Sequence, residues 1–369
     1  MIVLALNSGS SSLKFGLYRV QSNAAERLLA GHLDAVAELA GQLAGSTLPK
    51  PEAIGHRVVH AGPALRQHAV IDEAVLRQID AATAFAPLHT PAALAVIAHT
   101  AALFPTLPQV ACFDTAFHAT LPDSARVLPI PKALQAQGIQ RYGFHGLSCE
   151  SILQQLDHEL VQGLPDRMLI AHLGHGASVT AVKAGRSIDT SMGLTPSGGV
   201  VMGTRSGDLD PGVLIHLLRQ AGGDASRLED MLDRQSGLVG ISGLSSDMRR
   251  LHEAEASNAD ARLAVCIFCV AVAKQLAAMA TVLGGVDLIV FSGGIGENDG
   301  AVRAEICAAL GWFGVALDPE RNARGLGLVS AADSRCAVRV VASQEDEQIA
   351  RHTARLLRLL RLLRLLPKD

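Results

Sequence analysis

Three polar turns, each following an apolar run, carry the residue types that bind phosphate. The first, NSGSSSLKFG (7–16), places hydroxyls, a glycine and a lysine between two apolar runs, so that backbone N–H groups can approach an anion closely. An ordinary Ser-rich hairpin turn would use the same residues. The segment MLIAHLGHGASVTAVKAGRSI (168–188) repeats this plan of strand, turn and strand, and LIVFSGGIGEND (288–299) has a glycine turn before a helical segment. None of the three matches the Walker pattern G-x-x-x-x-G-K-[ST], so a P-loop is not predicted.

Two arginines lie in glycine-flanked segments where an exposed arginine would be unusual. Arg57 stands in GHRVVHAG and Arg205 in MGTRSGD. A planar guanidinium pairs bidentately with carboxylate or phosphoryl oxygens, so both are candidates for neutralising charge between two reacting anions, with a structural ion pair as the alternative. His145 in YGFHGLS is a candidate donor to a phosphoryl group, or a core histidine. Asp114 follows the apolar QVACF, and it is either a site carboxylate at a strand end or a helix N-cap.

Strand and helix signals alternate along the chain, which predicts α/β layers. The chain has 369 residues, of which 49% are hydrophobic and 35 are glycine, and this is enough for two cores. The two similar hairpins at 1–20 and 168–188 suggest a duplicated domain.

Composition also narrows the class of protein. A net charge of -3, without a basic block outside the C-terminal end, argues against nucleic acid as a partner. The N-terminus does not have the pattern of a signal peptide, and an uninterrupted apolar run of about 18 residues is not found, so no membrane span is expected. Six scattered cysteines in a chain of this size predict reduced thiols and a cytoplasmic protein.

Eight motifs stand in a characteristic order along nearly the whole chain: NSGSSSLK, GHRVVHAG, FAPLHTPAAL, CFDTAFHATLP, RYGFHGLS, DTSMGLTP, MGTRSGDLDPG and FSGGIGEN. In this order they resemble the acetate kinases of the acetate and sugar kinase and actin superfamily. The resemblance implies an α/β protein with two domains of duplicated ribonuclease H-like (actin-like ATPase) fold around a central cleft. The expected N-terminal domain spans 1–147, the expected nucleotide-binding domain spans 148–347, and a C-terminal helix at about 348–369 returns to the first.

The resemblance also implies a reaction and its site. The expected reaction is reversible transfer of the ATP γ-phosphoryl group to acetate, by a homodimer that uses Mg²⁺ or Mn²⁺. The implied catalytic residues are Arg57, Asp114, His145 and Arg205. Arg57 also belongs to the implied substrate site, together with the methyl pocket Val59, Leu88, Phe144 and Pro196. The implied nucleotide-binding residues are Ser12, Lys14, His172, Gly174, Gly176, Asp247, Arg249, Gly293, Gly294, Gly296 and Glu297. Asn7 and Glu345 are the implied metal residues.

Several positions depart from the pattern of this family. His175 replaces a usual Asn, Cys149 replaces a usual His, and Gln344 replaces a usual Asn beside Glu345. PSGG at 196–199 also replaces a stretch that usually carries Leu-Glu. None of these changes removes a proposed catalytic group. They concentrate near the nucleotide and the second turn, so an altered phosphoryl donor is a hypothesis to test.

Two other functions remain open at this stage. A kinase of propionate or another short acyl chain is the nearer alternative, because one methylene changes discrimination by only about 1 to 3 kcal/mol. A non-catalytic ATP-binding relative is the more distant one, and it would have no use for an arginine clamp on an acceptor. The tail ARLLRLLRLLRLLPKD (354–369) repeats Arg every three residues, so that the arginines drift around a helix rather than forming one polar face.

Overall fold

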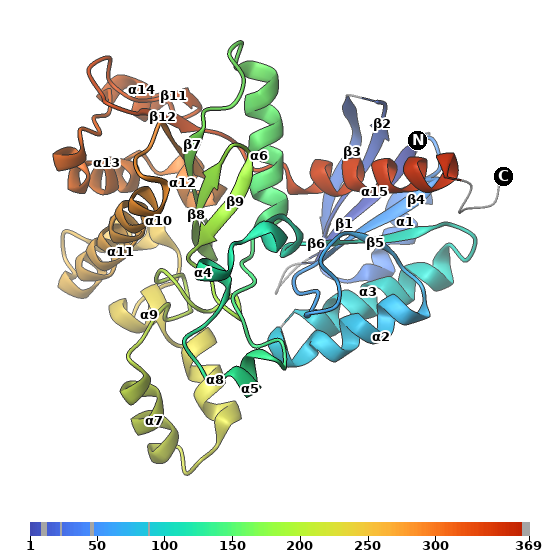
Figure 1. The fold of residues 1–369 in the computed structure, drawn as a ribbon, viewed down its shortest axis with the longest axis horizontal. Coiled ribbons are helices and arrows are strands. Elements are labelled where there is room, and N and C mark those ends of the chain that lie inside the picture. The colour runs from blue at the N-terminus through green and yellow to red at the C-terminus, as the bar shows by residue number, and fades with distance from the viewer. Residues whose placement is uncertain (9–12, 23, 45–47, 88, 364–369) are drawn as a thin grey trace. The chain divides into compact units, whose positions relative to one another are not determined.

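The computed structural model describes residues 1–8, 13–22, 24–44, 48–87 and 89–363. The chain divides into two compact units, whose helices and strands are labelled in Figure 1. The first unit contains residues 1–119, 144–154 and 344–369, and the second contains 120–143 and 155–343.

The expected domain boundary after residue 147 falls inside helix α6 (Gly146–Glu159). The segment 120–143 belongs to the second unit, although it was expected in the first domain. Arg141 explains this, because its guanidinium donates to the carbonyl oxygens of Thr190 and Met192, at 2.8 and 3.2 Å.

The first unit is built on a six-stranded sheet of order β3-β2-β1-β4-β6-β5. β1 forms a hairpin with β2 and is parallel to β4, which is parallel to β6, while the edge strands β3 and β5 are antiparallel to their neighbours. The strands are β1 (Ile2–Ser8), β2 (Leu13–Val20), β3 (Ala25–Leu33), β4 (Ala53–Val58), β5 (Ala69–Val70) and β6 (Gln109–Phe113).

Helices cover both faces of this sheet, because successive side chains of a buried strand point to opposite sides. Val3 and Ala5 of β1 share a core cluster with helix α15, whereas Leu4 and Leu6 share one with Val96 of α3. Figure 1 shows α15 in red along one face and α3, beside α2, along the other. The helices of this unit besides α6 are α1 (Leu39–Ala44), α2 (Glu73–Ala81), α3 (Thr90–Leu103), α15 (Glu345–Leu362) and the short 3-10 helices Val36–Glu38, Ala82–Phe85 and Ala116–Thr120.

The second unit repeats the first strand by strand. Its sheet has the order β11-β12-β10-β7-β8-β9, and β7 relates to β8, β9, β10 and β12 as β1 does to β2, β3, β4 and β6. The edge strand β11 is antiparallel to β12, as β5 is to β6. The strands are β7 (Arg167–Leu173), β8 (Ala177–Lys183), β9 (Arg186–Thr190), β10 (Leu288–Ser292), β11 (Gly327–Leu328) and β12 (Ala337–Val340). The duplicated α/β fold inferred from the two hairpins is confirmed.

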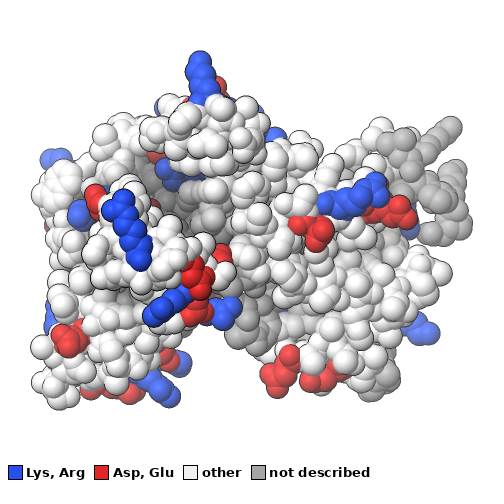
Figure 2. All heavy atoms as spheres, turned by 90° about the horizontal axis from the view of Figure 1, so that it is seen from below, with Lys and Arg blue, Asp and Glu red and all other residues white. Residues whose placement is uncertain are grey.

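Helix α11 (Ala259–Leu283) packs against β7 and β8. It is long and apolar enough to cross a membrane by length and composition alone, and half of its most apolar window is buried inside the fold. The remaining helices of the unit are α4 (Asp123–Arg126), α5 (Lys132–Gln135), α7 (Pro211–Gln220), α8 (Ala225–Arg234), α9 (Gly237–Ser242), α10 (Met248–Ala254), α12 (Gly293–Asn298), α13 (Gly300–Ala309), the 3-10 helix Gly311–Phe313 and α14 (Pro319–Arg324). Figure 2 shows basic and acidic side chains mixed over the visible face, and the described residues form no continuous basic surface on that face.

The C-terminal helix belongs to the first unit, as the sequence predicted, but it begins at Glu345 and ends at Leu362. Ile349 and Leu357 are fully buried in the cluster that contains β1. Arg358, in the repeating tail, donates to the carbonyl oxygens of Val20, at 2.5 Å, and Gln21, at 3.0 Å. The end of the tail, 364–369, lies outside the described residues.

Candidate active site

A buried ion pair joins the ends of two neighbouring parallel strands in the first unit. Arg57 lies near the end of β4, and Asp114 directly follows β6. The Nε and Nη2 atoms of Arg57 donate to Asp114 Oδ2 at 3.0 and 2.6 Å, and the two side chains are only 15% and 1% exposed. The carboxyl ends of parallel strands are the usual place for site residues in such sheets. This contact is the structural ion pair that was the alternative role for Arg57. It also places both side chains at the strand ends, where site residues are expected.

Asn7, at the end of β1, connects this pair to the start of α15. Its Oδ1 accepts from Arg57 Nη1 at 3.3 Å, and its Nδ2 donates to Glu345 Oε2 at 3.1 Å and to Asp346 Oδ1 at 2.8 Å. Asp346 was not among the sequence candidates. The signal that could have found it is its position beside Glu345 in the first turn of a helix.

The cluster has more acidic than basic groups. Asp114, Glu345 and Asp346 are accompanied by Arg57 and by Lys14, which pairs in register with Asn7. Burial raises the pKa of Asp114 and outweighs the opposing effect of Arg57, and the negative charge of Glu345 raises it further. Burial and Glu345 likewise raise the pKa of Asp346. Among these five side chains, the acidic groups therefore outnumber the basic groups by one.

The donor set fits a divalent cation. Asp114 Oδ1 is buried without a hydrogen-bond partner among the described residues. Carboxylate oxygens are the protein ligands that Mg²⁺ prefers, and a dication would supply the missing positive charge. The types of donor atom at this point of the first unit therefore suit Mg²⁺.

His145 lies next to Asp114 in a conformation that few residues other than glycine adopt. Its φ is 60°, in the left-handed region, and α6 begins at the following residue, Gly146. Gly146 donates its N–H to the Asp114 carbonyl at 2.9 Å, and a side chain on Gly146 would collide with that oxygen. Strained backbone of this kind is found preferentially at functional sites. The packing of α6 against the Asp114 turn is what holds His145 there.

The residues expected to form the methyl pocket are divided. Val59 and Phe144 are buried in the first unit, and the ring of Phe144 lies 5.5 Å from that of His60. Pro196 belongs to the second unit, where its carbonyl accepts from Arg205 Nη1 at 3.0 Å. Leu88 lies outside the described residues, as do Ser12 and the other residues of the first turn from 9 to 12.

Among the described residues, one group of three side chains has ligand atoms that all lie within 4.8 Å of one another, namely His68, Glu150 and His352, and the carboxylates of Asp114, Glu345 and Asp346 do not all lie that close together. The N–H of Phe113 donates to His68 Nδ1 at 3.1 Å, so the neutral ring carries its proton on Nε2, 3.8 Å from Glu150 Oε2. His352 Nε2 lies 2.9 Å from the same oxygen. Burial would raise the pKa of Glu150, but the two histidines lower it to about 2. The attraction between the two histidine rings and the Glu150 carboxylate therefore explains this cluster, which links α15 to α6.

The second unit contains the other two glycine turns. Gly174 donates its N–H to the Gly176 carbonyl at 2.9 Å in the β7–β8 hairpin. The His175 carbonyl accepts from the N–H of Gly203, and a Cβ on Gly203 would lie 2.7 Å from the imidazole. Burial and the positive charge of Arg205 lower the pKa of His175. Arg205 therefore lies near this turn, with a neutral histidine at the position of the usual Asn. His172 lies on β7, in register with Ser292.

The third turn follows β10, and the carboxylate of Glu297 binds its backbone. One oxygen of this carboxylate accepts from the N–H groups of Gly293 and Ser343, both at 2.9 Å. Gly293 has a φ of 77°, and a Cβ there would lie 2.7 Å from the Leu173 carbonyl oxygen. Glu297 was expected on the nucleotide side, and its carboxylate binds the backbone of the turn itself. Gly296 is buried within α12.

A cavity of about 780 Å³ brings several predicted segments of the second unit together. Its volume lies within the range of small-molecule sites. Asp247 caps α10 by accepting from the N–H of Arg249, and both residues also line the cavity. The lining residues are Gly174, His175, Ser246, Asp247, Met248, Arg249, His252, Gly294, Ile295, Asn298 and Asp299.

Comparison with known proteins places the chain in a family. Residues 29–351 match the family described as the acetokinase family. The chain belongs to the acetokinase family. An acetate kinase of Rhodopseudomonas palustris is 40% identical over 96% of this chain and 98% of its own, and one of Gloeobacter violaceus is 48% identical over 81% of this chain and 75% of its own. This membership makes the chain a kinase and confirms the resemblance inferred from the eight motifs.

Solved structures of a propionate kinase and an acetate kinase share the fold of this acetokinase chain. A propionate kinase from Francisella tularensis has a TM-score of 0.87 and 36% identity, covering 96% of this chain and 99% of its own. An acetate kinase from Porphyromonas gingivalis has a TM-score of 0.84 and 32% identity, with the same coverage. The similarity covers both units of this family member.

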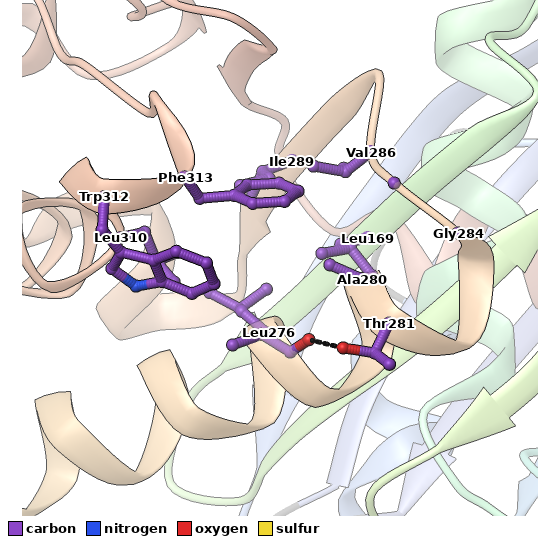
Figure 3. A pocket seen from close by; sticks show the side chains of 12 residues that line it. Leu169, Leu276, Ala280, Thr281, Gly284, Val286, Ile289, Leu310, Trp312 and Phe313 are labelled. Atoms are coloured by element: carbon purple, nitrogen blue, oxygen red, sulfur yellow. Dashed lines mark hydrogen bonds between the residues drawn. The ribbon is translucent and has the colours of Figure 1, made fainter.

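A second cavity of this acetokinase chain, of about 360 Å³, is apolar (Figure 3). Leu276 and Ala280 of α11 line it opposite Trp312 and Phe313. The hydroxyl of Thr281 is turned to the Ala277 carbonyl at 3.0 Å, the dashed line in the figure. The lining therefore offers little to an anion, and the cavity does not resemble a phosphate site.

The third turn of this acetokinase chain gives a prediction about stability. We expect Gly293→Ala to lower the free energy of unfolding by about 1 to 3 kcal/mol, because a Cβ at positive φ must also push against the Leu173 carbonyl. Gly294→Ala is the matched control, since nothing lies within 4 Å of a Cβ there. Urea unfolding of the two variants measures the difference, and equal stabilities would contradict the role assigned to Gly293.

Proposed function

We propose that the protein transfers the γ-phosphoryl group of ATP to acetate, reversibly, giving acetyl phosphate and ADP. The observation that carries the proposal is the cluster in which Arg57 pairs with Asp114 and joins the acids of α15 through Asn7. Membership of the acetokinase family and the names of the relatives support it.

The reaction joins two anions, and this determines what the residues must do. An acetate oxygen attacks the γ-phosphorus while the bond from that phosphorus to the ADP oxygen breaks. Acetate is already ionised at pH 7, so no base has to remove a proton. The protein therefore contributes positive charge and hydrogen-bond donors that are already oriented. In the proposal Arg57 binds the acceptor carboxylate, Asp114 orients Arg57, and Arg205 and His145 stabilise the phosphoryl group in transfer.

Mg²⁺ or Mn²⁺ is part of the proposal, held by the carboxylates of Asp114, Glu345 and Asp346. When bound, the ion would neutralise charge on the phosphoryl oxygens. Asn7 was expected as a metal residue. Because its amide is engaged with Arg57 and with both acids of α15, we assign it the positioning of those ligands.

The nucleotide is proposed to occupy the cavity of about 780 Å³ in the second unit. Gly294 and Asp247 line it, and Gly174 with Gly176 forms the turn at its edge. His172, Arg249, Gly293, Gly296 and Glu297 complete the proposed set in this unit, while Ser12 and Lys14 belong to the first turn.

Propionate is the second candidate acceptor, and the solved propionate kinase of the same fold favours including it. Val59 and Phe144 leave an apolar lining that would discriminate one methylene by about 1 to 3 kcal/mol. We also propose a cytoplasmic location, supported by six cysteines that are all free thiols. A homodimer is proposed from the family resemblance, and light scattering in solution tests it.

Acyl phosphate formation tests the function directly. The purified protein is supplied with Mg-ATP and acetate, propionate or butyrate, and the product is trapped with hydroxylamine. We expect acetate and propionate to react, with kcat/KM values within about 10 to 200-fold of each other. Parallel reactions with GTP and pyrophosphate test whether His175 has changed the donor, and a preference for ATP would discard that hypothesis. Binding of ATP without acyl phosphate from any acid would instead support a non-catalytic ATP-binding protein.

A further inference from the structure

His252 bridges two carboxylates in the wall of the larger cavity. It lies on α10, with Nδ1 2.6 Å from Glu255 Oε1 and Nε2 2.8 Å from Asp299 Oδ2. A neutral imidazole has one N–H and cannot donate to both oxygens. The geometry is therefore that of an imidazolium that donates from both nitrogens.

The two carboxylates belong to different segments, and of the two only Asp299 lines the cavity beside His252. Asp299 lies between α12 and α13, and its other oxygen accepts from the N–H of Val302 at 2.9 Å, which caps α13. Glu255 follows α10 directly. His252 thus ties the α10 wall, which includes Asp247, to the α12 wall, which includes Gly294.

Other charged groups around the bridge are largely paired. Arg262 of α11 donates to Glu255 at 3.4 Å and to Glu305 of α13 at 3.0 Å. On α10, Arg249 pairs with Asp247 at 2.8 Å. Within α13, Arg303 is buried and donates to the carbonyl oxygens of Gly296 and Glu297, both in α12.

The net effect on His252 favours its charged form. Partial burial lowers the pKa of His252, but Asp299 and Glu255 outweigh this, and the pKa is raised above its ordinary value. The imidazolium therefore persists to a higher pH than that of an ordinary histidine and is lost as the pH rises through that raised pKa. Deprotonation leaves a lone pair of the ring facing one of the two carboxylates.

We propose that protonated His252 is a positioning residue that holds the two walls of the cavity at the spacing a nucleoside requires, so that nucleotide affinity weakens as the pH rises. The inference rests on the proposed function, because it takes the cavity as the nucleotide site. His252 touches the walls and acts through them, and it takes no part in phosphoryl transfer.

Adenosine is the probe, because it has no phosphate that titrates in the range of a histidine. Its affinity is measured by calorimetry between about pH 6 and 9, which brackets that range. We expect the dissociation constant of the unaltered protein to rise about tenfold, the effect of losing one charge-assisted hydrogen bond. His252→Gln should bind weakly at every pH with a flat profile. His216→Gln, at an exposed histidine of α7, should keep the profile of the unaltered protein.

Steady-state kinetics separates this role from a general loss of structure. His252→Gln should raise the KM for ATP about tenfold at neutral pH, while kcat and the KM for acetate stay within about twofold. A normal adenosine profile in His252→Gln, or no adenosine binding by the unaltered protein, overturns the inference. Absence of acyl phosphate overturns the proposed function, and it leaves the adenosine result to decide the inference.

Discussion

Arg57→Gln is expected to lower kcat for acyl phosphate formation about a thousandfold or more, the scale of losing an arginine that stabilises a transferring phosphoryl group. The substitution removes the positive charge that offsets Asp114, while the acids Glu345 and Asp346 remain close by. It should therefore also lower the free energy of unfolding at neutral pH by about 1 to 3 kcal/mol. Because the pKa of Asp114 is already raised, this stability should return as the pH is lowered and the carboxyl binds a proton. Hydroxylamine trapping measures kcat, and urea unfolding at several pH values measures stability.

Arg351→Gln is the matched control. Arg351 lies on α15 and pairs with Glu347 at 2.6 Å, the same distance as between Arg57 and Asp114. Arg351 is partly buried in the same unit. The variant therefore measures the effect of losing any arginine–carboxylate pair of this kind. We expect its kcat to stay within about threefold of the unaltered protein. Similar kcat values for Arg57→Gln and Arg351→Gln would show that Arg57 is a structural residue only.

The sequence predicted the fold where the pattern is local. Apolar runs interrupted by polar turns identified both hairpins, β1–β2 and β7–β8, and hence the duplication. The boundary between the units depends instead on contacts across the chain. The guanidinium of Arg141 donates to the carbonyl oxygens of Thr190 and Met192, and no sequence periodicity within 120–143 predicts these hydrogen bonds.

The candidate site shows the same division. Arg57 was recognisable because it lies inside a glycine-flanked, otherwise apolar segment, and Asp114 because it follows an apolar run, and the structure places them in contact. Asp346 was not recognised, because an acid in the first turn of a helix is ordinarily a solvated residue that favours the helix dipole. Here, however, the start of α15 packs on the sheet, and Asn7 donates to it across 339 residues of sequence. His252 and Asp299 are 47 residues apart, and only the packing of α10 beside α12 reveals their contact.

Asp114→Asn is expected to separate activity from stability. At neutral pH the change removes one negative charge from a cluster in which the acids Asp114, Glu345 and Asp346 outnumber the bases Arg57 and Lys14, so the variant cluster carries less excess negative charge. The raised pKa of Asp114 means that its ionised form destabilises the fold at pH values above that pKa, and Asn carries no such penalty. We therefore expect the free energy of unfolding of the variant at pH 8 to be equal to or higher than that of the unaltered protein. This pH lies about four units above the ordinary pKa of an Asp.

The same variant should lose about 100 to 1000-fold in kcat, because Arg57 loses the carboxylate that orients it and the proposed Mg²⁺ loses a ligand. Asp287→Asn is the control, since Asp287 also accepts from an arginine, Arg167, at 2.5 Å, on the surface of the second unit. If the attraction to Arg57 outweighed the burial cost of the Asp114 carboxylate, the substitution would instead lower the free energy of unfolding, by about 3 to 5 kcal/mol for a broken buried pair. Loss of stability with kcat retained would contradict the role given to Asp114. Loss of kcat with stability retained would mean that the buried negative charge is kept for catalysis, at the expense of the fold.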